Sequence, residues 1–290
     1  MRSRRRRDPT ERTHAERLAS RDGYFAPDSP IRRLGNTPLT PVLGGGTAVL
    51  LQVAHPLVAV GVAEHSDYHR DLWSRLARTL RALYLVSFGT KEEAERAGAA
   101  VRAVHGHVRG TTRTKLGPFP AGTPYSAEDP ELMLWVHATL VFSSLSVYQR
   151  FERPLPPAEQ ERYYREMVLV ARLFGTPADV IPPTLADFDA YFAAQLAGPA
   201  ITVTPLAAEI AAVILKAPLP APLRMFAPAH RLATAGQLPP RLRSEYGLRW
   251  TRLHELVLPL AAQSVKVTTK PALRAASRLA PPPRVLATSS

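Results

Sequence analysis

The chain has 290 residues, of which 46% are hydrophobic, enough to form one large domain or two small ones. It contains no cysteine, which excludes disulfides, iron–sulfur clusters, thiolate-ligated haem and cysteine nucleophiles. The formal net charge is +13, and it is concentrated at the two ends. Residues 1–25 hold eight arginines against four acids, and residues 266–290 hold five basic residues and no acid. Such ends are typical of solvated tails that contact anionic lipid or nucleic acid without sequence specificity.

Helix signals dominate the first half of the chain, and no run of residues clearly predicts a strand. An apolar helix is predicted from residue 47 to about residue 62. We expect a kink at Pro56, because proline lacks the amide hydrogen that a helix interior requires. Asp71 is a predicted N-cap for the next helix, whose leucines recur at helical spacing up to about Gly89.

A capping box marks the start of the following helix. Thr90 and Glu93 have the spacing of that motif, and Gly110 predicts that the helix runs to Arg109. Residues 111–125 are rich in glycine, proline and threonine and are predicted to form a surface loop.

Asp129 followed by Pro130 predicts the start of a long helix that ends near Phe151. Further helices are expected over residues 157–175, 185–197, 204–216, 240–262 and 271–279.

These elements predict an all-α fold, a single-domain multi-helix bundle. We place the domain at residues 26–280, between a basic flexible tail at 1–25 and a C-terminal tail at 281–290. The long uncharged runs at 47–63 and 132–149 carry histidines and other polar groups, so we expect buried core helices and no transmembrane segment. The N-terminus lacks the apolar region of a secretory signal, which predicts a cytoplasmic protein. The basic tails are candidates for peripheral membrane contact, and without interleaved aromatic residues they predict no specific nucleic-acid binding.

The stretch VRAVHGHVRG (residues 101–110) is the main candidate site. On a continuous helix, Arg102 and Arg109 lie roughly 60° and 40° from His105, whereas His107 points away at roughly 200°. His105 would then lie between a pair of arginines and an apolar stripe formed by Val101, Val104 and Val108. This arrangement would suit a haem, with imidazole on iron and guanidinium groups on the propionates. The alternative is a buried histidine that donates to a backbone carbonyl beside solvated arginines.

From Tyr24 to about Tyr191 the sequence resembles the oxygenase family of the MpaB-type enzymes and latex-clearing proteins. The order and spacing of several short motifs carry this resemblance more than any one of them. They are GYF at residues 23–25, LQVAHP at 51–56, RLART at 75–79, FG at 88–89, VRAVH at 101–105 with RG at 109–110, DPEL at 129–132, WVH at 135–137 and YRE at 164–166.

The resemblance implies an all-α haem b protein whose helices enclose a haem pocket. It also implies an enzyme that acts with O2 on an apolar, unsaturated, isoprenoid-like substrate. His105 matches the iron ligand on the proximal side, and Arg102 and Arg109 match positions near the propionates. Arg75 and Thr79 match the pair that lines the distal side.

Two positions depart from the family pattern. The rubber-cleaving relatives have a lysine beside the distal threonine that can occupy the sixth iron position, whereas this chain has Arg78, which stays protonated and cannot ligate. The relatives also use a distal glutamate as a base, and Glu64 is the nearest candidate here. The rubber enzymes are exported, and this chain has no matching signal.

Other histidines are also candidates for functional residues. His65 and His69 have a spacing that can hold zinc, but no third ligand follows at regular spacing, so a solvated segment is favoured. We interpret His55 and Gln52 as a structural polar pair beside the predicted kink. His137 lies in an apolar helix and is the strongest rival to His105 as an iron ligand.

Three functions remain open from the sequence. The leading hypothesis is a haem-dependent oxygenase in which Arg75, Arg78 and Thr79 shape the oxygen side. A haem-binding sensor or carrier is the second, and a haem-free helical scaffold is the third. The substrate and the oligomeric state are not determined by the sequence.

Overall fold

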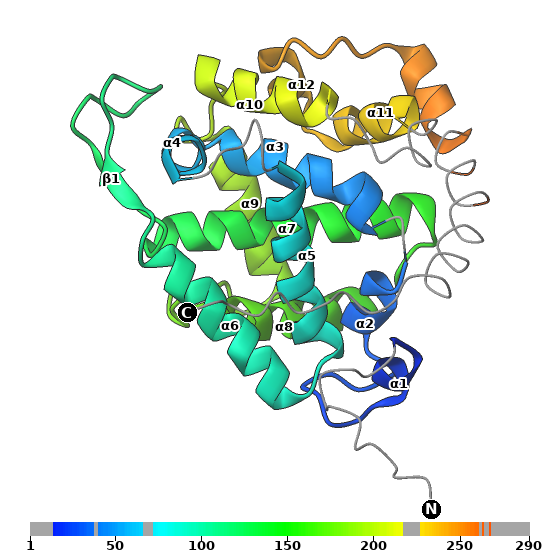
Figure 1. Ribbon diagram of the computed structural model, residues 1–290. Coiled ribbons are helices and arrows are strands. Elements are labelled where there is room, and N and C mark those ends of the chain that lie inside the picture. The colour runs from blue at the N-terminus through cyan, green and yellow to red at the C-terminus, as the bar shows by residue number, and fades with distance from the viewer. Residues whose placement is uncertain are drawn as a thin grey trace, which may run out of the picture.

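A computed structural model describes residues 14–37, 40–65, 72–216 and 227–260, together with residues 263 and 267. The expected all-α fold is confirmed, because these residues form helices and one short two-stranded sheet (Figure 1). In chain order the elements are α1 (His14–Ala19), α2 (Pro30–Gly35), the π-helical turn η2 (Thr40–Gly44), α3 (Gly45–Val53), α4 (Pro56–His65), α5 (Leu72–Phe88), α6 (Lys91–His105), β1 (Arg109–Thr111), β2 (Pro124–Ser126), α7 (Pro130–Phe151), α8 (Pro157–Leu173), α9 (Leu185–Ala197), α10 (Pro205–Lys216), α11 (Ala227–Gln237), α12 (Pro240–Glu245) and a further helical segment at 252–260.

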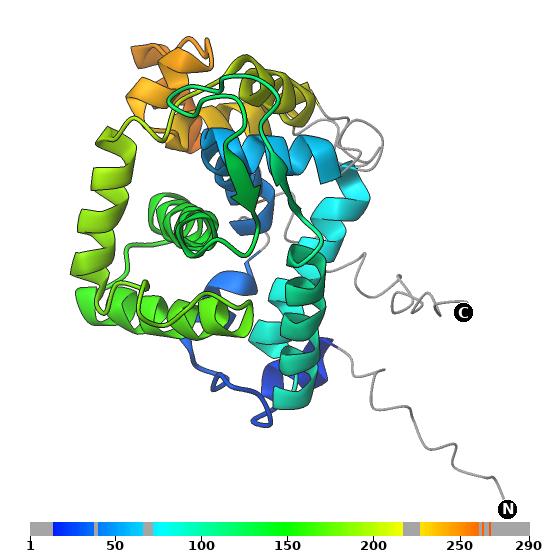
Figure 2. The same ribbon diagram turned by 90° about the vertical axis from the view of Figure 1, so that its left-hand side faces the viewer.

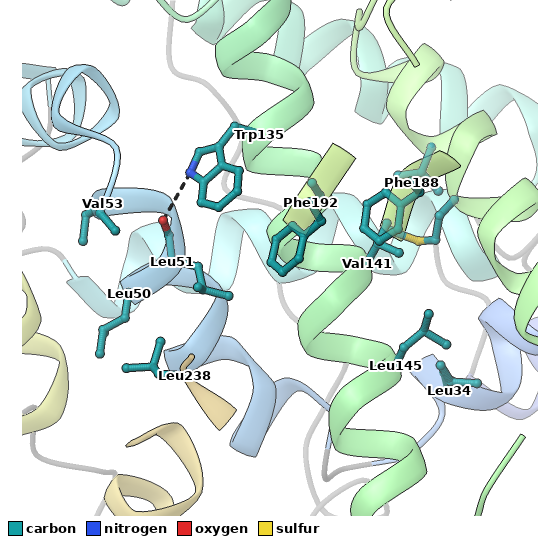
Figure 3. Close-up of a cluster of buried hydrophobic side chains, with 14 of the residues drawn as sticks. Leu34, Leu50, Leu51, Val53, Trp135, Val141, Leu145, Phe188, Phe192 and Leu238 are labelled. Carbon is teal, nitrogen blue, oxygen red and sulfur yellow. Dashed lines mark hydrogen bonds between the residues drawn. The ribbon is translucent and has the colours of Figure 1, made fainter. Parts of the chain in front are cut away.

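Helix α7 forms the centre of the bundle. Figure 2 shows it end-on, with α3, α6, α8 and α9 around it. Asp129 caps its first turn by accepting hydrogen bonds from the amides of Glu131 and Leu132, as the Asp-Pro pair predicts. The indole of Trp135 is buried, stacks on Phe192 and donates a hydrogen bond of 3.2 Å to the Leu51 carbonyl (Figure 3). The long apolar run is therefore buried because its helix is surrounded on several sides.

The predicted kink at Pro56 is a complete break. Helices α3 and α4 meet at an angle of 106°, so they do not form one bent helix. Carbonyls at the end of α3 accept hydrogen bonds from residues far along the chain, and the Leu50 carbonyl accepts from the Ala54 amide as well. Besides the Trp135 indole, the Tyr246 hydroxyl donates to the Leu50 carbonyl at 2.7 Å and the Thr202 amide donates to the Ala54 carbonyl at 2.8 Å. Residues from three other parts of the chain thus stabilise this corner.

Other elements differ from the predicted ones. Strands β1 and β2 pair antiparallel where a loop was expected, with Tyr125 opposite Gly110. Helix α11 was not predicted, and the helix predicted over residues 240–262 is interrupted after Glu245. The helix predicted at 271–279 lies outside the described residues.

Part of the predicted N-terminal tail is structured. Residues 14–19 form α1, and the guanidinium of Arg17 makes two hydrogen bonds, of 2.6 and 2.8 Å, to the carboxylate of Glu93 on α6. Both side chains are more than 90% buried. A buried and bidentate ion pair therefore ties this segment to the domain.

Helix α7 is the one continuous helix in the described part of the chain that is long and apolar enough to cross a membrane. Within its most apolar window, 61% of the residues are buried inside the protein. The central helix of a bundle has the same composition, and α7 occupies that place here.

Candidate functional site

Helix α6 ends at His105, four residues earlier than predicted. Its start agrees with the sequence, because Thr90 and Glu93 form a complete capping box. At its end Gly106 is the C-cap, and the chain then turns into β1, where Arg109 pairs with Ser126. The prediction that Arg109 shares a helix face with His105 is therefore wrong, because pairing with β2 replaces the last predicted turn of helix.

His107 points to solvent, as predicted. Its side chain is exposed, and its Nδ1 lies 2.7 Å from the Ala103 carbonyl oxygen. The ring thus makes its hydrogen bond to the preceding turn of the chain. Of the two histidines in the stretch, His105 is half-buried and His107 is exposed.

The His105 imidazole has a buried nitrogen without a hydrogen bond. Its Nδ1 is inaccessible to solvent and has no partner among the residues that the structure describes. Burial lowers the pKa of the ring, and the nearby carboxylate of Glu128 opposes this shift. The alternative in which this ring donates to a backbone carbonyl is therefore not seen at Nδ1. A buried polar atom without a partner is destabilising. A neutral imidazole with an unused nitrogen fits the role of an axial ligand.

The two arginines lie on different elements, Arg102 on α6 and Arg109 on β1. The guanidinium of Arg102 donates a hydrogen bond to the Leu173 carbonyl, the last residue of α8. Its aliphatic part packs against Gly175, which has a positive φ of 104° and where a Cβ would lie 3.1 Å from the Arg102 side chain. Arg109 is exposed on β1. Arg102 thus joins α6 to the end of α8, a role that the sequence did not indicate.

The three predicted distal residues lie on α5. Helices α5 and α6 diverge from their connecting turn, so the start of α5 lies apart from the end of α6, which carries His105 (Figure 1). Thr79 and Arg78 are exposed. Arg75 lies in the first turns of α5, and its side chain is outside the described part.

Glu64 is held by residues of the β1–β2 hairpin. The Tyr125 hydroxyl donates to Glu64 Oε2 at 2.6 Å, and Arg113 Nε lies 3.3 Å from Glu64 Oε1. The ring of His65 completes the cluster, with Nε2 3.2 Å from the Tyr125 oxygen. Burial and the bond to Glu64 raise the pKa of Tyr125 to about 12, so its hydroxyl stays protonated and can donate. No sequence signal identified Tyr125 or Arg113, because they are separated from Glu64 by the whole of α5 and α6.

The zinc hypothesis gains no support. Within the described ranges no group of three or more histidine, cysteine or carboxylate side chains could hold a metal ion. His65 contacts Tyr125, and His69 lies outside the described residues.

His55 and Gln52 do not form the expected polar pair. Gln52 donates to the Thr139 hydroxyl at 3.1 Å, whereas His55 Nδ1 accepts from the Leu57 amide at 3.3 Å. The His55 ring packs against Phe119 of the hairpin, with ring centroids 5.4 Å apart. His55 therefore caps the start of α4 and contacts the hairpin.

His137 is buried in the middle of α7 and remains the rival ligand. Its Nε2 is inaccessible to solvent and has no hydrogen-bond partner in the part of the chain described. Burial lowers its pKa to about 4, the same value as for His55.

These shifts predict acid sensitivity of the haem-free protein. The pKa of His137 falls from 6.5 to about 4 on folding, so below pH 6.5 the unfolded chain binds protons that the folded chain does not. The free energy of unfolding should therefore decrease as the pH is lowered from 6.5 to 4, by on the order of 3 kcal/mol for this residue. Urea unfolding across this range should show a smaller decrease for His137→Leu than for the wild type. The exposed residue His107 gives a matched control, and an equal decrease in His137→Leu and His107→Ala would contradict this assignment.

Comparison with known proteins identifies the family to which the chain is similar. The family model described as "ER-bound oxygenase mpaB/B'/Rubber oxygenase, catalytic domain" matches residues 31–267. Two proteins named as uncharacterized, Mb2261 of Mycobacterium bovis and Rv2237 of Mycobacterium tuberculosis, are each 28% identical over 212 residues. The match covers 71% of this chain and 80% of each relative. No solved structure matches significantly.

Proposed function

Because the chain belongs to the family of mpaB-type and rubber oxygenase catalytic domains, we propose that it is a haem b-dependent oxygenase. It would act with O2 on an apolar, unsaturated, isoprenoid-like substrate. The observation that carries the proposal is the buried, unpartnered Nδ1 of His105, in the motif that resembles the iron-binding segment of the family.

In this proposal His105 holds the iron from the end of α6. Haem b, when bound, supplies the capacity to bind and activate O2. The lowered pKa of His105 keeps its ring neutral at physiological pH, which is the form that ligates iron. Glu128, near the same ring, is a candidate to orient it.

Arg102 and Arg109 are the residues proposed to bind the propionates. Arg109 is exposed, and Arg102 is bound to the Leu173 carbonyl. If Arg102 released the Leu173 carbonyl and donated to a haem propionate instead, the new hydrogen bond would be charge-assisted. Arg75 and Thr79 are proposed to line the oxygen side. Arg78 beside them would leave the iron open there, because a guanidinium does not deprotonate to become a ligand.

Glu64 is the proposed base. Both carboxylate oxygens are engaged, one by the Tyr125 hydroxyl and one by Arg113. Each carboxylate oxygen keeps a further lone pair, and loss of the Arg113 contact would make Oε1 the more basic acceptor for a substrate proton. Arg113 is exposed, whereas Tyr125 is buried, so the Arg113 contact is the easier one to break.

The test of the function combines a spectrum with oxygen uptake. Protein purified from haem-supplemented cells should show a Soret band, and its reduced form should consume O2 when squalene is added. Squalane is the matched control, because it has the same carbon skeleton without double bonds. A Soret band without squalene-dependent uptake would favour a haem sensor or carrier. Colourless protein would refute haem binding, and the haem-free helical scaffold would then be the remaining hypothesis.

A further inference from the structure

The C-terminal helical segment exposes an unusual set of apolar side chains. Among the described residues, the large hydrophobic side chains with high exposure are Val104 and five others, all of which lie between residues 253 and 267. The exposed fractions are 66% for Leu253, 71% for Leu256, 68% for Leu260 and 65% for Val267. We call these four residues the apolar ridge.

The ridge lies opposite the face that packs on the domain. At roughly 100° per residue, Leu253, Leu256 and Leu260 fall within roughly 60° of one another and are centred opposite Leu258. Leu258 is fully buried in a cluster with Leu43 and Val147. The segment therefore has two apolar sides, one inside the protein and one facing outward.

The segment is anchored to the domain, so the ridge is not simply a detached end of the chain. Glu255 accepts hydrogen bonds from Arg150 at 2.7 Å and from the Trp250 indole at 2.6 Å. The guanidinium of Arg243 stacks on the same indole, 4.7 Å from its centroid. These contacts fix the rotation of the helix and hold the ridge outward.

Basic residues lie close to the ridge along the chain. Arg249 and Arg252 are exposed beside it. From residue 256 to residue 290 the sequence contains five basic residues and no acid. This charge disfavours a second copy of the chain as the occupant, because like charges would meet across the interface. It favours a surface that is apolar within and anionic at its border.

We propose that the apolar ridge inserts into the interface of an anionic lipid bilayer, while the exposed Arg249 and Arg252 bind the lipid headgroups. The leucines would lie at the level of the headgroup–acyl boundary. This attachment concerns a face of the molecule remote from α6, because the C-terminal segment and α6 lie on opposite sides in Figure 1. It holds whether or not the protein binds haem.

The test is co-sedimentation of the full chain with vesicles of phosphatidylcholine, with and without phosphatidylserine. The wild type should sediment with the phosphatidylserine vesicles and be released by salt. The double variant Leu253→Ser/Leu256→Ser should bind at least about tenfold more weakly, because two exposed leucines no longer insert. Val104→Ser, which removes an equally exposed apolar side chain from α6, should bind like the wild type.

Insertion of the ridge into the bilayer can be observed with a fluorescent label. Because the chain has no cysteine, a single introduced cysteine is the only thiol that the dye can label. Leu256→Cys labelled with an environment-sensitive dye should increase in fluorescence with phosphatidylserine vesicles, whereas the same dye at Ala99→Cys on exposed α6 should not. Wild-type binding that the serine variant retains would overturn the proposal, because the basic tails alone would then explain it. A wild type that sediments as a dimer without lipid, with a monomeric serine variant, would also overturn it.

Discussion

Replacing His105 by alanine should abolish stable haem binding. The side chain carries a buried nitrogen that no described residue satisfies, and its burial keeps the ring neutral. Loss of the axial nitrogen should weaken haem affinity by more than about 100-fold, beyond what loss of a residue that only orients a ligand produces. The measurement is the Soret absorbance of protein purified with added haem, followed by haem titration of the haem-free form.

The same stretch supplies the control. His107→Ala removes an exposed imidazole that lies beside a local carbonyl, so the Soret band should persist. His137→Ala decides between the two candidate ligands, because each has a buried nitrogen without a partner among the described residues. If His137→Ala removes the haem and His105→Ala retains it, the ligand lies on α7 and the assignment to α6 is wrong.

Replacing Glu93 by alanine should reduce the free energy of unfolding by about 4 kcal/mol, measured by urea unfolding. Glu93 neutralises the buried guanidinium of Arg17 through two hydrogen bonds, so its removal leaves a charge inside the protein without a partner. It also closes the capping box by accepting from the Thr90 amide at 2.8 Å. Both losses act at the start of α6, the helix that carries His105.

Glu92 is a matched control for Glu93. It pairs with Arg96 at 3.0 Å, and both side chains are mostly exposed, so Glu92→Ala should change stability by less than about 0.5 kcal/mol. Replacing the pair together, as Arg17→Met/Glu93→Met, should restore much of the loss, because no unpaired charge remains. Equal effects of Glu93→Ala and Glu92→Ala would show that Arg17 is not buried against Glu93.

The predicted helix starts are confirmed where the signal is local. Thr90 and Glu93 are three residues apart, and Asp129 directly precedes Pro130, so each cap forms within one turn. The start predicted at Asp129 agrees with α7 to the residue. An interruption at Pro56 was predicted for the same reason, because proline lacks the amide hydrogen that a helix interior requires. It was predicted as a kink, whereas the structure has a complete break.

Helix ends were harder to predict. The end of the candidate-site helix was predicted at Gly110, and no local signal marked the earlier Gly106 as its end. The chain ends the helix at the earlier one because residues 109–111 pair with residues 124–126. Arg109 was assigned to the wrong element for this reason, whereas Arg102 and His105 lie on one helix as predicted.

The sequence by itself determined the all-α class, the main helix starts and the orientation of two neighbouring histidines, of which His105 is half-buried and His107 is exposed. Only the tertiary structure decided that Arg17 is buried on Glu93, that Tyr125 and Arg113 hold Glu64, and that leucines at the C-terminal end face outward. The physical reason is distance along the chain. A cap or a proline acts on its own turn of helix, whereas the burial of a charge or the position of a carboxylate depends on groups 49 to 76 residues away, which only packing brings together.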